Sequence, residues 1–252
     1  MHIQLIRSAT LVITTAGRTI LVDPMLCPAG AMDPIANTPN PRRNPLVELP
    51  FDDAELARLL ARIDAVLVTH THRDHWDARA VELIPKQTPI LCQPEDEAKI
   101  RGDGFSDVRP ITAELTWNGI TLTRTGGHHG TGEIGRMLAP VSGFVLRAAG
   151  EPTLYLAGDT IWCAEVADAL RQHQPDVTVV NAAGARFLTG DPIVMTAEEV
   201  VQVCRALPTT RVIAVHLEAL NHCLLTRSEL RETLRAAGVL ERGAIPEDGE
   251  TA

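Results

Sequence analysis

The sequence lacks the features of disulfide-stabilised, membrane-spanning and secreted proteins. A disulfide framework is not expected, because the cysteines are odd in number and form no CxxC pair, which suits a reducing cytoplasm. The five are Cys27, Cys92, Cys163, Cys204 and Cys223. No apolar run approaches the length of a membrane-spanning helix. The first residues also lack the basic segment and uninterrupted apolar stretch of a signal peptide. We therefore expect a cytoplasmic protein without a membrane partner.

Basic residues are scarce as well. Lysine and arginine number 23 against 32 acidic residues, and the formal net charge is −9 at pH 7. Nucleic-acid binding depends on a basic surface, and the nearest approach to a basic run is Arg42-Arg43. We expect no nucleic-acid partner. The expected partner is a small-molecule substrate, and an anionic one stays open because a local pocket can oppose the global charge. The oligomeric state is left open.

The hydrophobic pattern predicts an α/β protein. The chain has 252 residues, 45% of them hydrophobic, which suits one large domain with a sizeable core. Residues 2–25 alternate around a break at Ala16-Gly17, so two or three antiparallel strands are expected there. Short apolar runs then predict strands over 65–70, 89–91, 142–148, 152–160, 176–185 and 211–219, and a hairpin over 115–127. Helical spacing predicts helices over 52–63, 78–84, 94–100, 162–173, 197–207 and 227–238.

This order of elements predicts one domain over residues 1–252, built of two similar halves. Each half, over about 1–125 and 126–241, begins with a set of strands and continues with alternating strands and helices. No linker separates the two halves. Residues 242–252 are expected to form a frayed acidic tail. Residues 24–50 include seven prolines and show little periodic pattern. A connection of that length is typical of an ordered lid beside an active site or of a passive surface loop, and both stay open.

The most informative stretch is VLVTHTHRDHWD, residues 66–77. It places His70, His72, Asp74 and His75 directly behind a predicted buried strand. His-x-His on an extended segment puts both imidazoles on one side, where they can bind one metal ion. Asp74 and His75 lie on the following turn and point to a neighbouring position, where a second ion can bind.

Further candidate ligands follow other predicted strands. His128 and His129 lie in the segment RTGGHHGTGEIG, Asp159 ends YLAGD, and His216 ends VIAVH, with His222 beyond. Ligands that leave strand ends at one edge are how α/β enzymes assemble their sites. Taken alone, Asp159 also fits a helix N-cap and His216 a buried core histidine. The glycine-rich residues 130–135 are consistent with an anion cradle or with a plain turn.

These residues carry a family resemblance. HTHRDH at 70–75 resembles the His-x-His-x-Asp-His signature of the metallo-β-lactamase-fold hydrolases, and the later motifs follow in the order of that family. The opening SATLVITTAGRTILVDPML is similar to the start of the ascorbate-6-phosphate lactonase-like subgroup. The resemblance implies a four-layer αβ/βα sandwich with a dinuclear site at one edge. Two divalent ions are implied, zinc being favoured, with manganese and iron as alternatives.

The resemblance also implies a role for each candidate residue. The first ion would be bound by His70, His72 and a histidine of the 128–129 pair, the second by Asp74, His75 and His216, with Asp159 bridging. The context GHHG favours His129 over His128, which would then line the pocket or support a ligand. Asp74 is expected to orient the nucleophilic water and carry its proton. Beyond the last ligand, His222, Asn221 and Glu218 are candidates for the substrate site or incidental loop residues.

The predicted function is a metal-dependent hydrolase of a small ester, lactone or phosphoester. A lactone or ester is favoured by the subgroup resemblance. The alternatives are a phosphodiesterase of the same fold and a non-catalytic metal-binding or sensor protein. The acidic balance disfavours a nuclease, and the absence of a signal peptide disfavours an exported β-lactamase.

Overall fold

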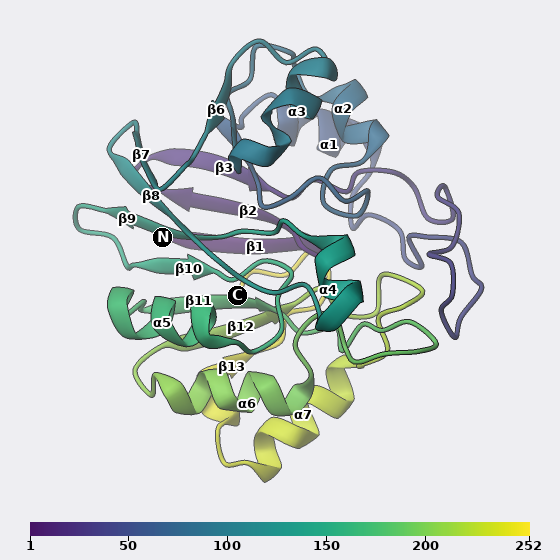
Figure 1. Cartoon of the computed structure of the whole chain (residues 1–252). Helices are drawn as coiled ribbons and strands as arrows, with labels where there is room; N and C mark the ends of the chain where they lie inside the picture. The colour runs from purple at the N-terminus through teal and green to yellow at the C-terminus, as the bar shows by residue number, and fades with distance from the viewer.

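Two mixed β-sheets lie at the centre of the computed structural model, which describes all 252 residues (Figure 1). In the first sheet β1, β2 and β3 are antiparallel, and β3 to β6 run parallel. Its six strands, in spatial order, are β1 His2–Arg7, β2 Thr10–Thr15, β3 Arg18–Val22, β4 Ala65–Val68, β5 Ile90–Cys92 and β6 Val108–Pro110. The predicted antiparallel opening is confirmed, whereas β6 was not predicted.

The second sheet has seven strands. Those from β7 to β10 are antiparallel, and those from β10 to β13 are parallel. They are β7 Glu114–Trp117, β8 Ile120–Thr125, β9 Gly143–Ala148, β10 Leu154–Leu156, β11 Val177–Asn181, β12 Arg211–Val215 and β13 Gly243–Ala244. The chain thus enters the second sheet at Glu114, so the predicted hairpin of 115–127 belongs to that sheet.

Six of the seven α-helices lie where the periodicity predicts them, whereas α4 was not predicted. The seven are α1 Asp53–Leu60, α2 Ala78–Leu83, α3 Glu97–Gly102, α4 Gly132–Leu138, α5 Ala164–His173, α6 Ala197–Ala206 and α7 Arg227–Ala236, with 3-10 turns at Pro94–Asp96 and Leu240–Arg242. Capping boxes, in which Ncap and N3 side chains bond each other's backbone, start α1, α6 and α7. The longest helices have ten residues, and none combines the length and apolar character of a membrane span.

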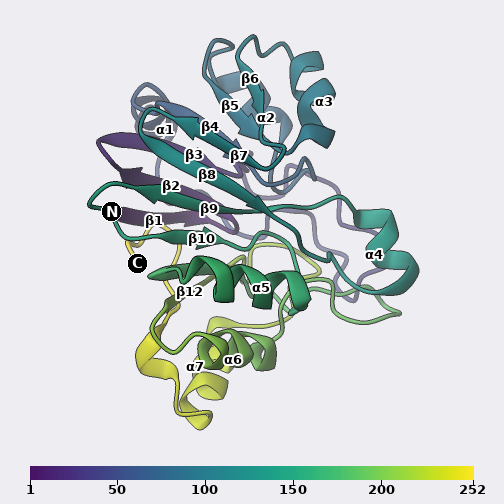
Figure 2. The ribbon, with the colours of Figure 1, turned by 60° about the vertical axis from the view of Figure 1, so that its left-hand side comes forward.

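Three apolar clusters define four layers. One lies between the sheets and includes Leu5, Ile13, Phe144 and Leu156. A second fills the space between the first sheet and its helices, and a third that between the second sheet and α5, α6 and α7. Figure 2 shows α2 and α3 on one outer side and α5, α6 and α7 on the other. The predicted four-layer αβ/βα sandwich is confirmed.

The expectation of a frayed tail over residues 242–252 is wrong. Gly243 and Ala244 pair with β12 as a parallel strand. Further on, the Leu5 N–H donates to the Glu250 carbonyl at 2.9 Å, and the Ala252 N–H donates to the Ile3 carbonyl at 2.9 Å. β1 is an edge strand of the first sheet, so its free backbone groups give the tail a place to bind.

Candidate metal centre

Candidate ligands from four strand ends converge at one edge of the molecule. The segment after β4 supplies four of them, and the segments after β8, β10 and β12 supply one each. Their ligand atoms form two groups, each within 4.8 Å: His70, His72 and His129 in one, and Asp74, His75, Asp159 and His216 in the other. Six of these side chains are buried, and His72 is half-buried. The structure thus brings together seven residues that are scattered over about 150 positions of the chain.

The first group is formed by histidine nitrogens. His70 Nε2 lies 3.0 Å from His72 Nδ1. His129 Nε2 lies 3.4 Å from Asp159 Oδ2, and His70 Nε2 lies 3.9 Å from the same oxygen. These atoms face one small volume, which suits an ion with nitrogen ligands.

The second group shares Asp159 with the first. His75 Nε2 lies 3.2 Å from Asp159 Oδ2, and His216 Nε2 lies 3.8 Å from Asp159 Oδ1. His216 Nε2 is also 3.4 Å from Asp74 Oδ2 and 3.3 Å from His75 Nε2. Asp159 therefore lies between the groups, in the position that a bridging carboxylate needs. The individual ligand assignments stay predictions.

The outer ring nitrogens of three candidate histidines contact the surrounding protein, so that the other nitrogen of each ring faces the centre. His129 Nδ1 donates to the Ile193 carbonyl at 2.8 Å, and His75 Nδ1 donates to Asp23 Oδ2 at 2.9 Å. His70 Nδ1 lies 3.1 Å from Thr69 Oγ1. Such outer hydrogen bonds fix the tautomer and orientation of metal-binding histidines. By donor chemistry and by orientation, these residues fit divalent ions.

The ionisable side chains of the second group change one another's pKa values. Burial alone would lower the pKa of His75, but Asp159, Asp74 and Asp23 raise it to about 10. Burial would raise the pKa of Asp74 and Asp159, yet His75 and His216 hold both pKa values well below the usual range. Two buried carboxylates are thus ionised beside protonated imidazoles, and divalent ions would replace those protons as the counter-charge.

His128 and His129 are separated by the structure. His129 is buried in the first group, at 4% exposure. The side chain of His128 is 55% exposed, and its Nε2 lies 3.0 Å from Glu165 Oε1. The predicted preference for His129 agrees with this placement, although the placement alone does not test metal binding.

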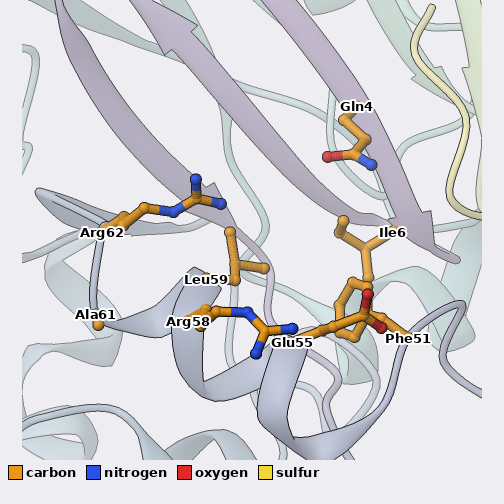
Figure 3. A pocket seen from close by; sticks show the side chains of 8 residues that line it. All are labelled: Gln4, Ile6, Phe51, Glu55, Arg58, Leu59, Ala61 and Arg62. Carbon is orange, nitrogen blue, oxygen red and sulfur yellow. The ribbon is translucent and has the colours of Figure 1, made fainter.

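A cavity of about 250 Å³ adjoins the centre. Three of its lining residues, His72, Asp74 and His129, are candidate ligands. The others are Ile35, Ala36, Arg73, Leu138, Phe187, Ile193 and His222. A larger hollow of about 520 Å³ lies between α1 and β1, where Figure 3 shows Arg58, Leu59 and Ile6, but no candidate ligand lines it. A third hollow, of about 650 Å³, is lined by one candidate ligand, His129. Three candidate ligands line the cavity of about 250 Å³, so the chemistry favours that cavity as the substrate site.

The proline-rich segment reaches this cavity through Ile35 and Ala36. Hydrogen bonds to the buried Asn221 hold this segment in place. The Asn221 Nδ2 donates to the Asn40 carbonyl at 2.6 Å, and its Oδ1 accepts from Asn44 Nδ2 at 2.7 Å. An ordered segment at the cavity is one of the two possibilities that the sequence left open. Its movement as a lid stays a prediction.

Three expectations about surrounding residues have different outcomes. His222 lines the cavity, and its contact with a substrate stays a prediction; burial lowers its pKa to about 4, so the ring is neutral. Glu218 does not line the cavity, because its Oε2 is held by Arg227 Nη1 at 2.5 Å. Residues 130–135 are not a plain turn, since α4 begins at Gly132, and anion binding by this segment stays a prediction.

Two buried residues of the site were not predicted. Asp23, just after β3, accepts hydrogen bonds from the Thr69 N–H and hydroxyl, both at 2.7 Å, as well as from His75. Asn181, at the end of β11, donates to Asp159 Oδ1 at 2.6 Å. Each is a polar residue at the end of an apolar strand, the same signal that identified Asp159. Asp23 supports both groups, because Thr69 contacts His70.

Comparison with known proteins agrees with the fold and the site. A family model described as the beta-lactamase superfamily domain matches residues 18–217. The UPF0173 protein YddR of Bacillus subtilis is 37% identical over 100% of this chain and 99% of its own length. The chain therefore belongs to the beta-lactamase superfamily domain family and, within it, to the UPF0173 metal-dependent hydrolase family.

Two solved structures are similar over the whole chain. An isothiocyanate hydrolase from Delia radicum gut bacteria has a TM-score of 0.94 at 39% identity, over 100% of this chain and 98% of that one. A possible metal-dependent hydrolase from Veillonella parvula has a TM-score of 0.95 at 37% identity, with the same coverage. None of the three relatives named here is described as a lactonase, so the likeness to the ascorbate-6-phosphate lactonase-like subgroup stays a prediction.

Proposed function

We propose that this protein is a metal-dependent hydrolase of small electrophilic carbon compounds, with isothiocyanates as the leading substrate class. The observation that carries the proposal is a small cavity, with 5 hydrophobic residues among its 10 lining residues, directly beside the cluster of seven candidate ligands. The similarity to an isothiocyanate hydrolase over the whole chain supports that substrate class. Esters and lactones, which also react at an electrophilic carbon, are the second class.

The cavity lining suits a neutral substrate with an apolar substituent. Leu138, Phe187 and Ile193 present apolar side chains. Arg73 is the only lysine or arginine of the lining, and its Nη2 already donates to the Asp33 carbonyl at 2.7 Å. A phosphoester would find little counter-charge here beyond the metal ions. The cavity volume of about 250 Å³ fits a small molecule.

Two side chains have roles in binding and proton transfer. Asp74 lines the cavity and is ionised, so it can hold the attacking water and take its proton. His222 is buried and neutral, and its Nδ1 has no protein hydrogen-bond partner, so it can bind a polar atom of the substrate. Divalent ions, when bound, supply an activated water and withdraw electrons from the electrophile. We propose zinc, because imidazole and carboxylate ligands suit it; manganese and iron are the alternatives.

The overall reaction with an isothiocyanate needs no further reactant. One water adds across the C=N bond, its oxygen to carbon and a proton to nitrogen. The acidic proton of the resulting thiocarbamic acid then moves to nitrogen as the C–N bond breaks, which yields a primary amine and carbonyl sulfide. We propose that Asp74 carries the proton from the attacking water to the nitrogen.

The test is turnover by the zinc-loaded protein of benzyl isothiocyanate, an aryl ester, a γ-lactone and a bis-aryl phosphate. We expect amine release from the isothiocyanate to be fastest and to depend on metal. Faster ester or lactone hydrolysis would move the substrate to the second class, and faster phosphate hydrolysis would identify a phosphodiesterase. A metal-loaded protein that turns over none of the four would favour the non-catalytic sensor.

A further inference from the structure

A second set of metal-binding side chains lies outside the candidate centre. The ligand atoms of His128, Cys163 and Glu165 are within 4.8 Å of one another. They line a hollow of about 650 Å³ at the surface between the loop before α4 and the start of α5. The set contains an imidazole nitrogen, a sulfur and a carboxylate oxygen, which are the three ligand types of protein zinc sites.

This set is distinct from the candidate centre even though His128 and His129 are adjacent. Both ring nitrogens of His129 are directed inward, Nδ1 to the Ile193 carbonyl and Nε2 towards Asp159. The ring of His128 contacts Glu165 instead, and its side chain is 55% exposed. The ring nitrogens of the two histidines thus belong to different ligand groups, although both residues line the hollow of about 650 Å³.

Backbone contacts hold the two supporting segments together. The His128 N–H donates to Thr160 Oγ1, and the Ile161 N–H donates to the His128 carbonyl, both at 2.9 Å. The loop approaches so closely that a Cβ on Gly127 would lie 2.9 Å from Thr160 Cβ. The three ligands are therefore placed by a fixed backbone, so that binding an ion costs little conformational entropy.

A simple ion pair does not account for all three residues. His128 and Glu165 are 55% and 42% exposed at their side chains, so their pair contributes little to stability. Cys163 occupies the N-cap of α5, yet its side chain makes no capping hydrogen bond. A cysteine there is a poor cap, whereas a thiol beside an imidazole and a carboxylate is a ready ligand.

We propose that His128, Cys163 and Glu165 bind a third divalent ion of the zinc type, with water completing the coordination. Binding displaces the thiol proton of Cys163 to solvent, and the sulfur binds as thiolate. The ion ties the loop that carries His129 to the first turn of α5. This inference is independent of the proposed hydrolase function, because it concerns binding outside the substrate cavity.

The test is titration of the metal-stripped protein with Co²⁺, followed by near-ultraviolet absorption. A thiolate bound to cobalt gives a charge-transfer band, and the seven candidate ligands of the main centre include no cysteine. We expect the band in the unmodified protein, its loss in Cys163→Ser, and its weakening in His128→Gln. Elemental analysis after zinc loading should give one equivalent less for Cys163→Ser than for the unmodified chain, whatever the content of the main centre.

The matched control is Cys223→Ser, because the Cys223 Sγ lies 3.5 Å from His216 Nδ1 and is the cysteine beside the main centre. The band should persist in this variant. Its loss in Cys223→Ser, its persistence in Cys163→Ser, or equal zinc content in the unmodified and Cys163→Ser proteins would each overturn the proposal. Circular dichroism of each variant confirms that the comparison is between folded proteins.

Discussion

At the scale of single residues, the adjacent histidines His128 and His129 allow the sharpest comparison. In a Cys163→Ser background, which removes the proposed third ion, we expect His129→Ala to lower the metal content of the main centre. His128→Ala should leave it unchanged, because this ring faces Glu165. Zinc content after dialysis is the measurement. Equal losses, or a larger loss in the His128 variant, would mean that the ligand assignment is wrong.

Asp74 is the residue on which the proposed chemistry depends most. Asp74→Asn keeps the shape and one ligand oxygen of the side chain but removes its charge and its ability to take a proton. Because general-base assistance is commonly worth about 10²–10⁴-fold, turnover at saturating metal should fall by that order. Metal affinity should fall much less. Turnover close to that of the unmodified protein would remove Asp74 from proton transfer.

Asp23 is predicted to act through the histidines that it orients. It accepts hydrogen bonds from His75 and Thr69, so Asp23→Asn should weaken zinc binding by about 10–100-fold, as is usual for such outer partners. The matched control is Thr71→Val, since the hydroxyl of Thr71 bonds Asp96 and not a candidate ligand. Competition with a chromogenic chelator gives both affinities. An Asp23 variant that binds zinc as well as the control would rule out this positioning role.

At the scale of secondary structure, local signals explain what could be predicted. Capping residues such as Thr196 and Thr226 precede amphipathic runs, so the starts of α6 and α7 are readable from the sequence. The strand β6, Val108–Pro110, is short and contains a proline, so it has no local signal and forms by pairing with β5. The tail was missed for the same reason, because its partners β1 and β12 are distant in the chain.

The docked tail makes a prediction about stability. Arg227 of α7 is buried, and its guanidinium bonds Asp248 at 2.7 Å and Glu218 at 2.5 Å. Because hydrogen bonds to charged groups contribute about 1.5–3 kcal/mol each, Arg227→Ala should lower the free energy of unfolding by at least that amount. The control Arg171→Ala breaks an exposed pair with Asp168 and should cost less than about 1 kcal/mol.

Urea denaturation of both arginine variants measures this difference. Equal effects would show that the contacts of Arg227 with the tail do not stabilise the fold.

At the scale of the whole molecule, the candidate ligands could be predicted from their residue types and from their order along the chain. His70, Asp159 and His216 each follow an apolar strand, and parallel strands deliver such residues to one edge. The cavity wall was not predictable, because Ile35 and Phe187 come from loops without a regular pattern. The position of Glu218 outside the cavity lining was not predictable for a related reason, since its partner Arg227 lies in the next helix.

The central claim is that this chain hydrolyses a small electrophile by means of metal ions at the strand ends. The most direct measurement is turnover of benzyl isothiocyanate by Cys163→Ser protein, first stripped of metal and then titrated with zinc. The account predicts that stripping abolishes turnover and that activity returns in full when two equivalents per chain have bound. Full activity in the stripped protein, or no activity with two zinc ions bound, would contradict it.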